Sequence, residues 1–274
     1  MRGRVLSGIA VMSSVAVLTG CGASSSGSAG PAKPAPSSVP SQSAPAATSS
    51  PTPAGKPLAG KTISIDPGHN GLNGANPGLM ASPVPAGPFQ KPCNTSGTST
   101  ASGYQEHAFN FDVATRLVAI LRSEGANVVE TRTNDHGIGP CVNERAAIAN
   151  KAHADAAISI HGDGAPSSGY GFHVILPALI KGYTEPIVVP SKKLGYDIRD
   201  AFHAGTGEPY SSYLGNNGID VRSDLAGLNL SKVPAVFIEC GNMANSGDAS
   251  RMTDPAWRQR AAASLAKGLT TYLR

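Results

Sequence analysis

The stretch Thr62-Ile63-Ser64-Ile65-Asp66-Pro67-Gly68-His69 shows on a small scale how this 274-residue chain is built. A short apolar run bounded by Asp, Pro and Gly predicts a strand over residues 62–66 that ends in a tight turn. The turn would project the His69 imidazole from the end of the strand, where α/β folds place their ligand-binding groups. Taken alone, His69 is equally compatible with a structural histidine.

Four further apolar runs with similar boundaries predict strands over residues 127–132, 156–161, 171–176 and 235–239. Helical patterns predict helices over residues 105–124, 142–152, 191–203 and 255–273. Strands that alternate with helices indicate an α/β fold, here a single domain with a central twisted, largely parallel sheet flanked by helices. We place this domain at residues 58–274. Residues 70–103 and 204–230 are rich in Gly with Pro, Ser, Thr or Asn, and predict long loops that shape a substrate cleft.

The first 57 residues predict export and a membrane anchor. Arg2 and Arg4 precede an apolar run that is too short to span a membrane and is typical of a signal peptide over residues 1–20. Leu18-Thr19-Gly20-Cys21 resembles a bacterial lipobox, so we expect Cys21 to carry a lipid anchor. An ordinary signal peptide with an incidental cysteine is the alternative. Residues 21–57, mostly Ser, Ala, Pro, Gly and Thr, predict a disordered tether. The expected location is the cell envelope, lipid-anchored to the outer face of the cytoplasmic membrane.

Charge and cysteine usage narrow the function classes. Four of the 22 basic residues and none of the 18 acidic ones precede Gly60, so the predicted domain carries 18 of each sign. This balance argues against a nucleic-acid partner. Cys93 and Cys141 lie in Gly/Pro-rich loops of an exported domain and could form a disulfide. Cys240 follows an apolar strand and is expected to be a packed free thiol.

Three further side chains complete a candidate metal site with His69. His161 ends the apolar run 156–160 and is followed by Gly162-Asp163-Gly164, so it is expected to face the same rim of the sheet. Glu106 lies in the first turn of the predicted helix, where it is either a cap or a ligand, and His107 is its rival. Glu239 closes an apolar strand and is costly there unless paired. It suits a general base beside a metal-activated water, with an arginine ion pair as the alternative. Two imidazoles, one carboxylate and a spare carboxylate are what a catalytic zinc requires.

In this order, the motifs resemble the zinc-dependent N-acetylmuramoyl-L-alanine amidases of the amidase 3 type, from Lys61 to the C-terminus. The strongest parts are Ile65-Asp66-Pro67-Gly68-His69, Glu106 with Asn110, the block from Val129 to His161 that includes Arg145, and the segment from Pro234 to Asn245. The Cys93/Cys141 pair and the long segment after His69 are similar to mycobacterial or other actinobacterial members.

The resemblance implies Zn²⁺ bound by His69, Glu106 and His161, with Glu239 as the catalytic carboxylate. The implied substrate is peptidoglycan or a muropeptide, cut between N-acetylmuramic acid and L-alanine by a monomer. Asn70 and Gly162-Asp163 depart from the family pattern without removing a ligand. Another zinc-dependent cell-wall peptidase or deacetylase is the alternative, although no HExxH pair is present. A non-catalytic wall-binding lipoprotein is a third interpretation.

Overall fold

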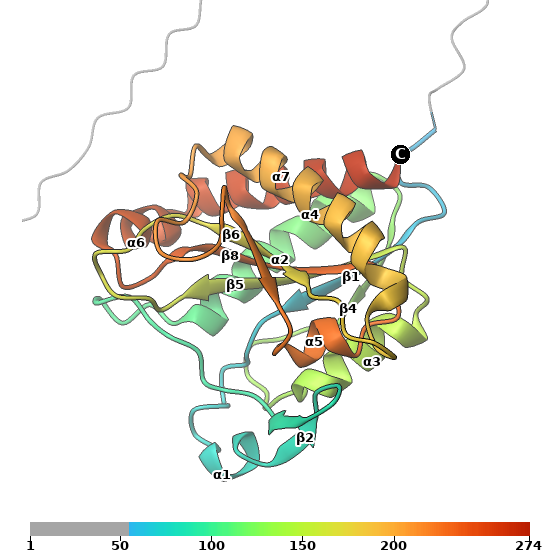
Figure 1. Cartoon of the computed structure of the whole chain (residues 1–274). Coiled ribbons are helices and arrows are strands. Elements are labelled where there is room, and N and C mark those ends of the chain that lie inside the picture. Colours follow the sequence, from blue (N-terminus) through green and yellow to red (C-terminus); the bar gives the residue numbers. More distant parts are fainter. Residues whose placement is uncertain (1–54) are drawn as a thin grey trace, which may run out of the picture. The chain divides into compact units, whose positions relative to one another are not determined.

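Six strands of the computed structural model, which describes residues 55–274, line up in one sheet in the order β4-β1-β5-β8-β6-β7 (Figure 1). The strands are β1 (Thr62–Pro67), β4 (Asn127–Glu130), β5 (Ala156–Asp163), β6 (His173–Pro177), β7 (Ile219–Arg222) and β8 (Ala235–Asn242). Strands β6 and β8 pair antiparallel, and the other pairings are parallel. The predicted α/β fold with a largely parallel sheet is confirmed.

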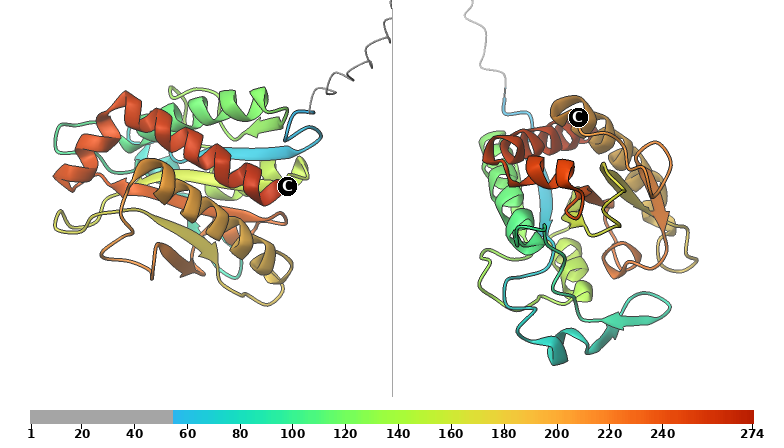
Figure 2. Two further views of the ribbon diagram at one scale, coloured as in Figure 1. Left: turned by 90° about the horizontal axis from the view of Figure 1, so that it is seen from above. Right: turned by 90° about the vertical axis from the view of Figure 1, so that its left-hand side faces the viewer.

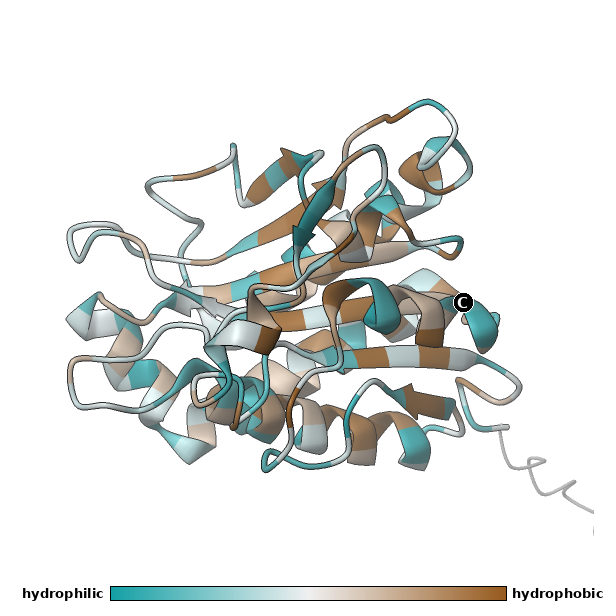
Figure 3. Ribbon diagram, turned by 90° about the horizontal axis from the view of Figure 1, so that it is seen from below, coloured by the Kyte–Doolittle hydropathy of each residue, from teal (hydrophilic) through white to brown (hydrophobic). Residues whose placement is uncertain are grey.

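The two faces of the sheet differ in chemistry. One face carries Ile63, Ile65, Ile158 and Ile160, which belong to the main hydrophobic core together with residues of α2 (Glu106–Ser123), α4 (Glu185–Thr206) and α7 (Pro255–Leu273). These three helices lie over that face (Figure 2). The opposite face is covered by the smaller α3 (Val142–Lys151) and α5 (Ala226–Asn229). Brown hydrophobic bands mark the strands in the view from below (Figure 3).

The four predicted helices are all present, with small differences in their ends. Helix α7 has the predicted bounds, and Asp254 caps it by accepting from the backbone N–H groups of Ala256 and Trp257. Helix α4 begins at Glu185, six residues before the predicted start. Pro186 suits the first turn, where a missing N–H costs nothing, and Pro190 follows one turn later. The helix therefore starts through a proline-rich segment that sequence pattern alone assigns to a loop.

The two predicted long loops are wrong in part, because both contain regular structure. Residues 70–103 include the short helix α1 (Pro77–Met80) and a hairpin of β2 (Pro83–Pro85) and β3 (Gln90–Pro92). Residues 204–230 include β7, which pairs with β6, and α5. These elements have only three or four residues each, too few to show a hydrophobic period. A further short helix, α6 (Ser246–Thr253), precedes α7.

Cys93 and Cys141 form a disulfide with an S–S distance of 2.09 Å, as predicted, and Cys240 is a buried free thiol. The disulfide joins the segment after β3 to the residue that precedes α3. The predicted signal peptide, the Cys21 anchor and nearly all of the tether fall on residues 1–54, outside the described residues. Within residues 55–274, no helix combines the length and apolar character needed to cross a membrane.

Candidate metal centre

His69 leaves the end of β1 in a left-handed backbone conformation, with φ of 59°. Such a conformation is uncommon for a residue with a side chain. Arg145 holds this turn: its Nη2 donates to the His69 carbonyl at 2.7 Å and its Nη1 to the Pro67 carbonyl at 2.7 Å. Gly68 is required between them, because a Cβ there would lie 2.1 Å from the ring of His161. The turn thus brings the two histidine rings together, in edge contact with centroids 5.0 Å apart.

Glu106 is the first residue of α2, and its side chain points at both histidines. Its Oε1 lies 3.1 Å from Nε2 of His69 and 2.9 Å from Nδ1 of His161. Its Oε2 accepts a hydrogen bond from the backbone N–H of Thr98 at 2.9 Å. The rival His107 instead pairs with Asp135, at 2.7 Å. Glu106, and not His107, therefore faces the two histidines, and capping does not explain its orientation.

Both histidines have their second ring nitrogen occupied. Nδ1 of His69 lies 3.0 Å from the carbonyl of Thr95, which can only accept a hydrogen bond. Nε2 of His161 lies 3.1 Å from the hydroxyl of Ser159, and that hydroxyl donates to Asp66 at 2.6 Å. Each ring can therefore keep a proton on its outer nitrogen, which leaves the inner nitrogen available to a metal ion beside Glu106. Outer partners of this kind fix the tautomer of metal-binding histidines.

The donor set fits a catalytic zinc ion. One ligand atom from each of His69, Glu106 and His161 can be chosen so that all three lie within 4.8 Å of one another. Donors about 2.1 Å from a tetrahedral zinc lie roughly 3.4 Å apart, close to the separations around Glu106 Oε1. Burial raises the pKa of Glu106, but the charge of His69 and hydrogen bonds from both rings outweigh burial and hold it well below its usual value. A buried carboxylate with two imidazoles is a site for a cation.

Glu239 lies beside this set because strand register places it there. It is paired with His161 across β5 and β8, and residues in register point to the same face of a sheet. Burial, followed by the charges of Glu106 and Asp163, raises its pKa well above the usual value, and Arg222 opposes the shift. Its Oε2 is buried without a partner in the part of the chain that the structure describes. Over the same residues it makes no ion pair, so the arginine alternative fails.

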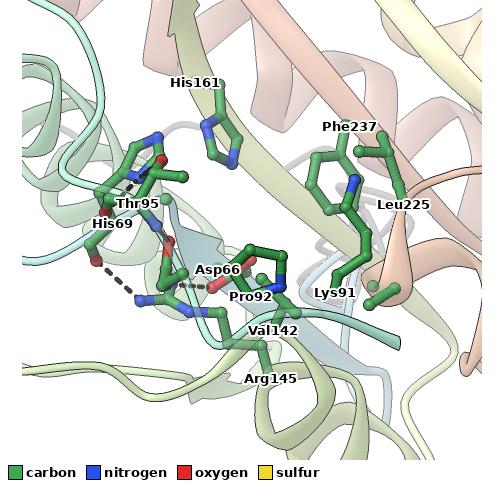
Figure 4. A pocket seen from close by; sticks show the side chains of 14 residues that line it. Asp66, His69, Lys91, Pro92, Thr95, Val142, Arg145, His161, Leu225 and Phe237 are labelled. Atoms are coloured by element: carbon green, nitrogen blue, oxygen red, sulfur yellow. Dashed lines mark hydrogen bonds and ion pairs between the residues drawn. The ribbon is translucent and has the colours of Figure 1, made fainter. Parts of the chain in front are cut away.

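Open space flanks the three candidate ligands on two sides. The first cleft, about 590 Å³, is also lined by Glu239, Asp163 and Arg222. The second, about 830 Å³, lies between the β2–β3 hairpin and α5 and is lined by Lys91, Pro92, Val142 and Ala226 (Figure 4). His69, His161, Thr95, Leu225 and Phe237 line both. A substrate can therefore extend on either side of the ligand set.

A family model described as N-acetylmuramoyl-L-alanine amidase matches residues 63–271 of the chain. The chain belongs to this amidase family. The amidase Rv3717 of Mycobacterium tuberculosis is 42% identical over 228 residues, which cover 81% of this chain and 89% of the relative. The crystal structure of the amidase Ami1 from Mycobacterium smegmatis matches with 40% identity and a TM-score of 0.74, covering 79% of this chain and 98% of that one. Ami1 from Mycobacterium abscessus, in its apo form, matches with 38% identity and a TM-score of 0.74, covering 79% and 100%. The predicted family is confirmed, and with it the class of cell-wall hydrolase.

Sequence patterns pointed to the candidate ligand residues of this amidase but did not identify several side chains that contact them or line the clefts. Ser159 stands two residues before His161, and the two-residue period of a strand could have placed both on one face. Phe237, two residues before Glu239, stacks on His161 with ring centroids 5.5 Å apart. Lys91 and Arg222 lie in segments predicted as loops and carried no signal. His173, which is 1% exposed, is in register with Glu239 but does not line either cleft.

Proposed function

We propose that the chain hydrolyses the amide between the lactyl group of N-acetylmuramic acid and L-alanine in peptidoglycan, with a zinc ion held by His69, Glu106 and His161. The observation that carries this proposal is the convergence of these side chains with the unpaired Glu239 at one rim of the sheet. Membership of the amidase family supplies the bond, since the relatives are named for it.

The ion would supply Lewis-acid chemistry, which polarises the scissile carbonyl and makes the attacking water more acidic. The protein's own contribution is orientation. Thr95 and Ser159 hold the two imidazoles in the tautomers that bind a metal, and Thr98 holds the second oxygen of Glu106. One carboxylate and two neutral imidazoles leave a dication with net positive charge, which favours the negative charge that develops on the amide oxygen.

Glu239 is proposed to move the protons. As a carboxylate it takes a proton from the attacking water, and as an acid it delivers that proton to the nitrogen of L-alanine as the bond breaks. A raised pKa suits both roles, because a carboxylate whose pKa lies nearer the working pH is a stronger base and exchanges its proton with little free-energy cost in either direction. Glu239 makes no ion pair with any of residues 55–274, and its Oε2 has no hydrogen-bond partner there, so the carboxylate is free to take up and deliver the proton.

The bond is tested by mass spectrometry of muramyl-dipeptide digests with zinc-loaded protein and the Glu239→Ala variant. We expect free L-alanyl peptide and intact N-acetylmuramic acid from the unmodified chain alone. Release of acetate would indicate a deacetylase, and a cut within the peptide would indicate a peptidase. Intact dipeptide, with polymeric wall also left uncut, would refute the amidase proposal.

The location remains a proposal from sequence. We propose that Cys21 carries a lipid that holds the catalytic domain outside the cytoplasmic membrane. In cell fractionation, Cys21→Ser should move the protein from the membrane fraction to the soluble exported fraction or block its processing. An unchanged membrane fraction would refute the lipid anchor.

A further inference from the structure

Two cations on separate elements converge on a single carboxylate beside the candidate metal centre. Arg222, at the end of β7, contacts Asp224 through Nε at 2.8 Å and Nη2 at 2.7 Å, in a two-pronged arrangement. Lys91, on β3 of the hairpin, donates from Nζ to the Asp224 carbonyl at 2.7 Å, and Nζ lies 3.5 Å from Oδ2. Two positive charges therefore share one negative charge.

This cluster has unused capacity for an anion. Lys91, Arg222 and Asp224 carry a net positive charge, because two cations face one carboxylate. The hydrogen bond from Arg222 lowers the pKa of Asp224 to about 2 and keeps that carboxylate ionised. Nη1 of Arg222 has no hydrogen-bond partner within residues 55–274. The side chains of Lys91 and Arg222 are 33% and 35% exposed, so a ligand can reach both.

The position of the cations relates them to the proposed cut. Arg222 lines the cleft that contains Glu239. Lys91 lines the second cleft, which shares Phe237 and Leu225 with the first and is drawn in Figure 4. Both clefts include His69 and His161. A peptide whose first amide lies over the ligand set can extend into either cleft, and so toward Arg222 or toward Lys91. The guanidinium fork matches a carboxylate in geometry, as its contact with Asp224 already shows.

We propose that Lys91 and Arg222 form a carboxylate-binding subsite, which selects muramyl peptides whose residue after L-alanine carries a free carboxylate. The inference rests on the proposed function, because it assigns the subsite to that substrate. Asp224 is the internal competitor: it holds the two cations in place and is partly displaced by the carboxylate of the substrate.

The test compares two substrates that differ by one charge and that both have the γ-carboxyl group blocked as an amide: N-acetylmuramoyl-L-alanyl-D-glutamine, with a free α-carboxylate, and its α-carboxamide. Zinc-loaded protein should favour the acid by about tenfold in kcat/KM, mainly through KM, the effect of one charge-assisted hydrogen bond. Arg222→Gln and Lys91→Gln should each remove most of this preference. Because Arg222 also lowers the pKa of Glu239, the preference is measured within each variant, as the ratio of kcat/KM for the acid to kcat/KM for the carboxamide. Lys151→Gln, an exposed lysine on α3, is the control and should change neither substrate.

Asp224→Asn separates a binding role from a structural one. Removing the competing carboxylate raises the local charge, so the acid should bind more tightly and its KM should fall. If Asp224→Asn instead weakens the acid as much as Arg222→Gln does, the cluster is a structural bridge and the inference is wrong. Equal kcat/KM for acid and carboxamide with the unmodified chain would also overturn it.

Binding of the dipeptides L-alanyl-D-glutamine and its α-carboxamide, measured by calorimetry on zinc-loaded protein, separates this inference from the proposed function. Tighter binding of the acid, lost in Arg222→Gln, supports the subsite even if no muramyl peptide is cut. Cleavage at the muramyl amide with equal binding of both dipeptides leaves the function standing and refutes the subsite.

Discussion

Two regions beside the candidate metal centre differ in how they are held together: the sheet edge that carries the candidate ligands, and a wall of loops and short elements. The ligand edge consists of the ends of β1 and β5 with the first turn of α2, and each candidate ligand side chain has a hydrogen-bond partner that fixes its orientation: Thr95, Thr98 or Ser159. The loop wall consists of the β2–β3 hairpin and residues 219–229. It is held by one disulfide and by ion pairs of the partly exposed side chains Lys91, Arg222 and Asp224. Catalytic groups need fixed geometry, whereas a wall of short elements can vary with the substrate.

The sharpest way to isolate the chemistry of the edge is Glu239→Gln, which keeps the size of the side chain and removes its base. We expect kcat to fall by about 10³-fold, within the range for loss of a general base. Zinc content, measured by mass spectrometry of the metal, should stay at one ion per chain, since Glu239 is not among the three proposed ligands. A variant that loses zinc as well would make Glu239 part of the metal site.

The wall can be loosened without touching the edge by replacing Cys93 and Cys141 with serine. The disulfide spans 48 residues, and its removal should lower the free energy of unfolding by at most roughly 4 kcal/mol on the chain-entropy estimate. We expect thermal unfolding at a lower temperature, a raised KM, and zinc affinity within about threefold of the unmodified chain. Equal loss of zinc affinity and stability would show that edge and wall fold as one unit.

A smaller effect is expected from Ser159→Ala, which removes the partner of His161 Nε2 within the edge. Loss of an outer partner of this kind weakens metal binding by about 10- to 100-fold. Competition with a chelator measures this change. Ser64→Ala is the matched control, because Ser64 is also a buried serine in the sheet and has no side-chain hydrogen bond among residues 55–274. Equal affinities in the two variants would contradict the role of Ser159.

The ligand edge could be predicted from sequence because its signals are local. His69, His161 and Glu239 each follow a short apolar run, and parallel strands bring such ends to one edge. Choosing Glu106 over His107 required the structure, since both residues lie in the first turn of α2 and the sequence pattern does not show which one faces the histidines. The two side chains point in different directions because Glu106 contacts Thr98 and His107 contacts Asp135. Both contact residues lie outside α2, so the helical pattern does not reveal them.

The loop wall could not be predicted because its contacts join segments that share no pattern. Lys91 and Asp224 are 133 residues apart, and the strands β3 and β7, which contain Lys91 and Arg222, have too few residues to show alternation. Only the cysteines marked this region, since an exported domain favours their pairing. Residues that act through distant neighbours leave little trace in a single sequence.

The smallest expected effect is a shift in pH dependence from Asp163→Asn, at the end of β5, where Asp163 accepts a hydrogen bond from Tyr213. The groups around Glu239 are Glu106, His161, Asp163, His173 and Arg222. Because Asp163 is one of two carboxylates that raise the pKa of Glu239, its neutralisation should lower that pKa. A base must be deprotonated to act, so the acid limb of kcat/KM should move to lower pH.

Asparagine suits this test because it preserves the local contacts of Asp163. Its oxygen can accept from the Gly164 N–H, and its amide can donate to the Tyr213 hydroxyl that now donates to the carboxylate. Asp220→Asn, on β7, removes a carboxylate that does not act on Glu239 and should leave the profile unchanged. A shift of the acid limb to higher pH, or equal shifts in both variants, would show that Asp163 does not tune the base and that its position after His161 serves only the loop wall.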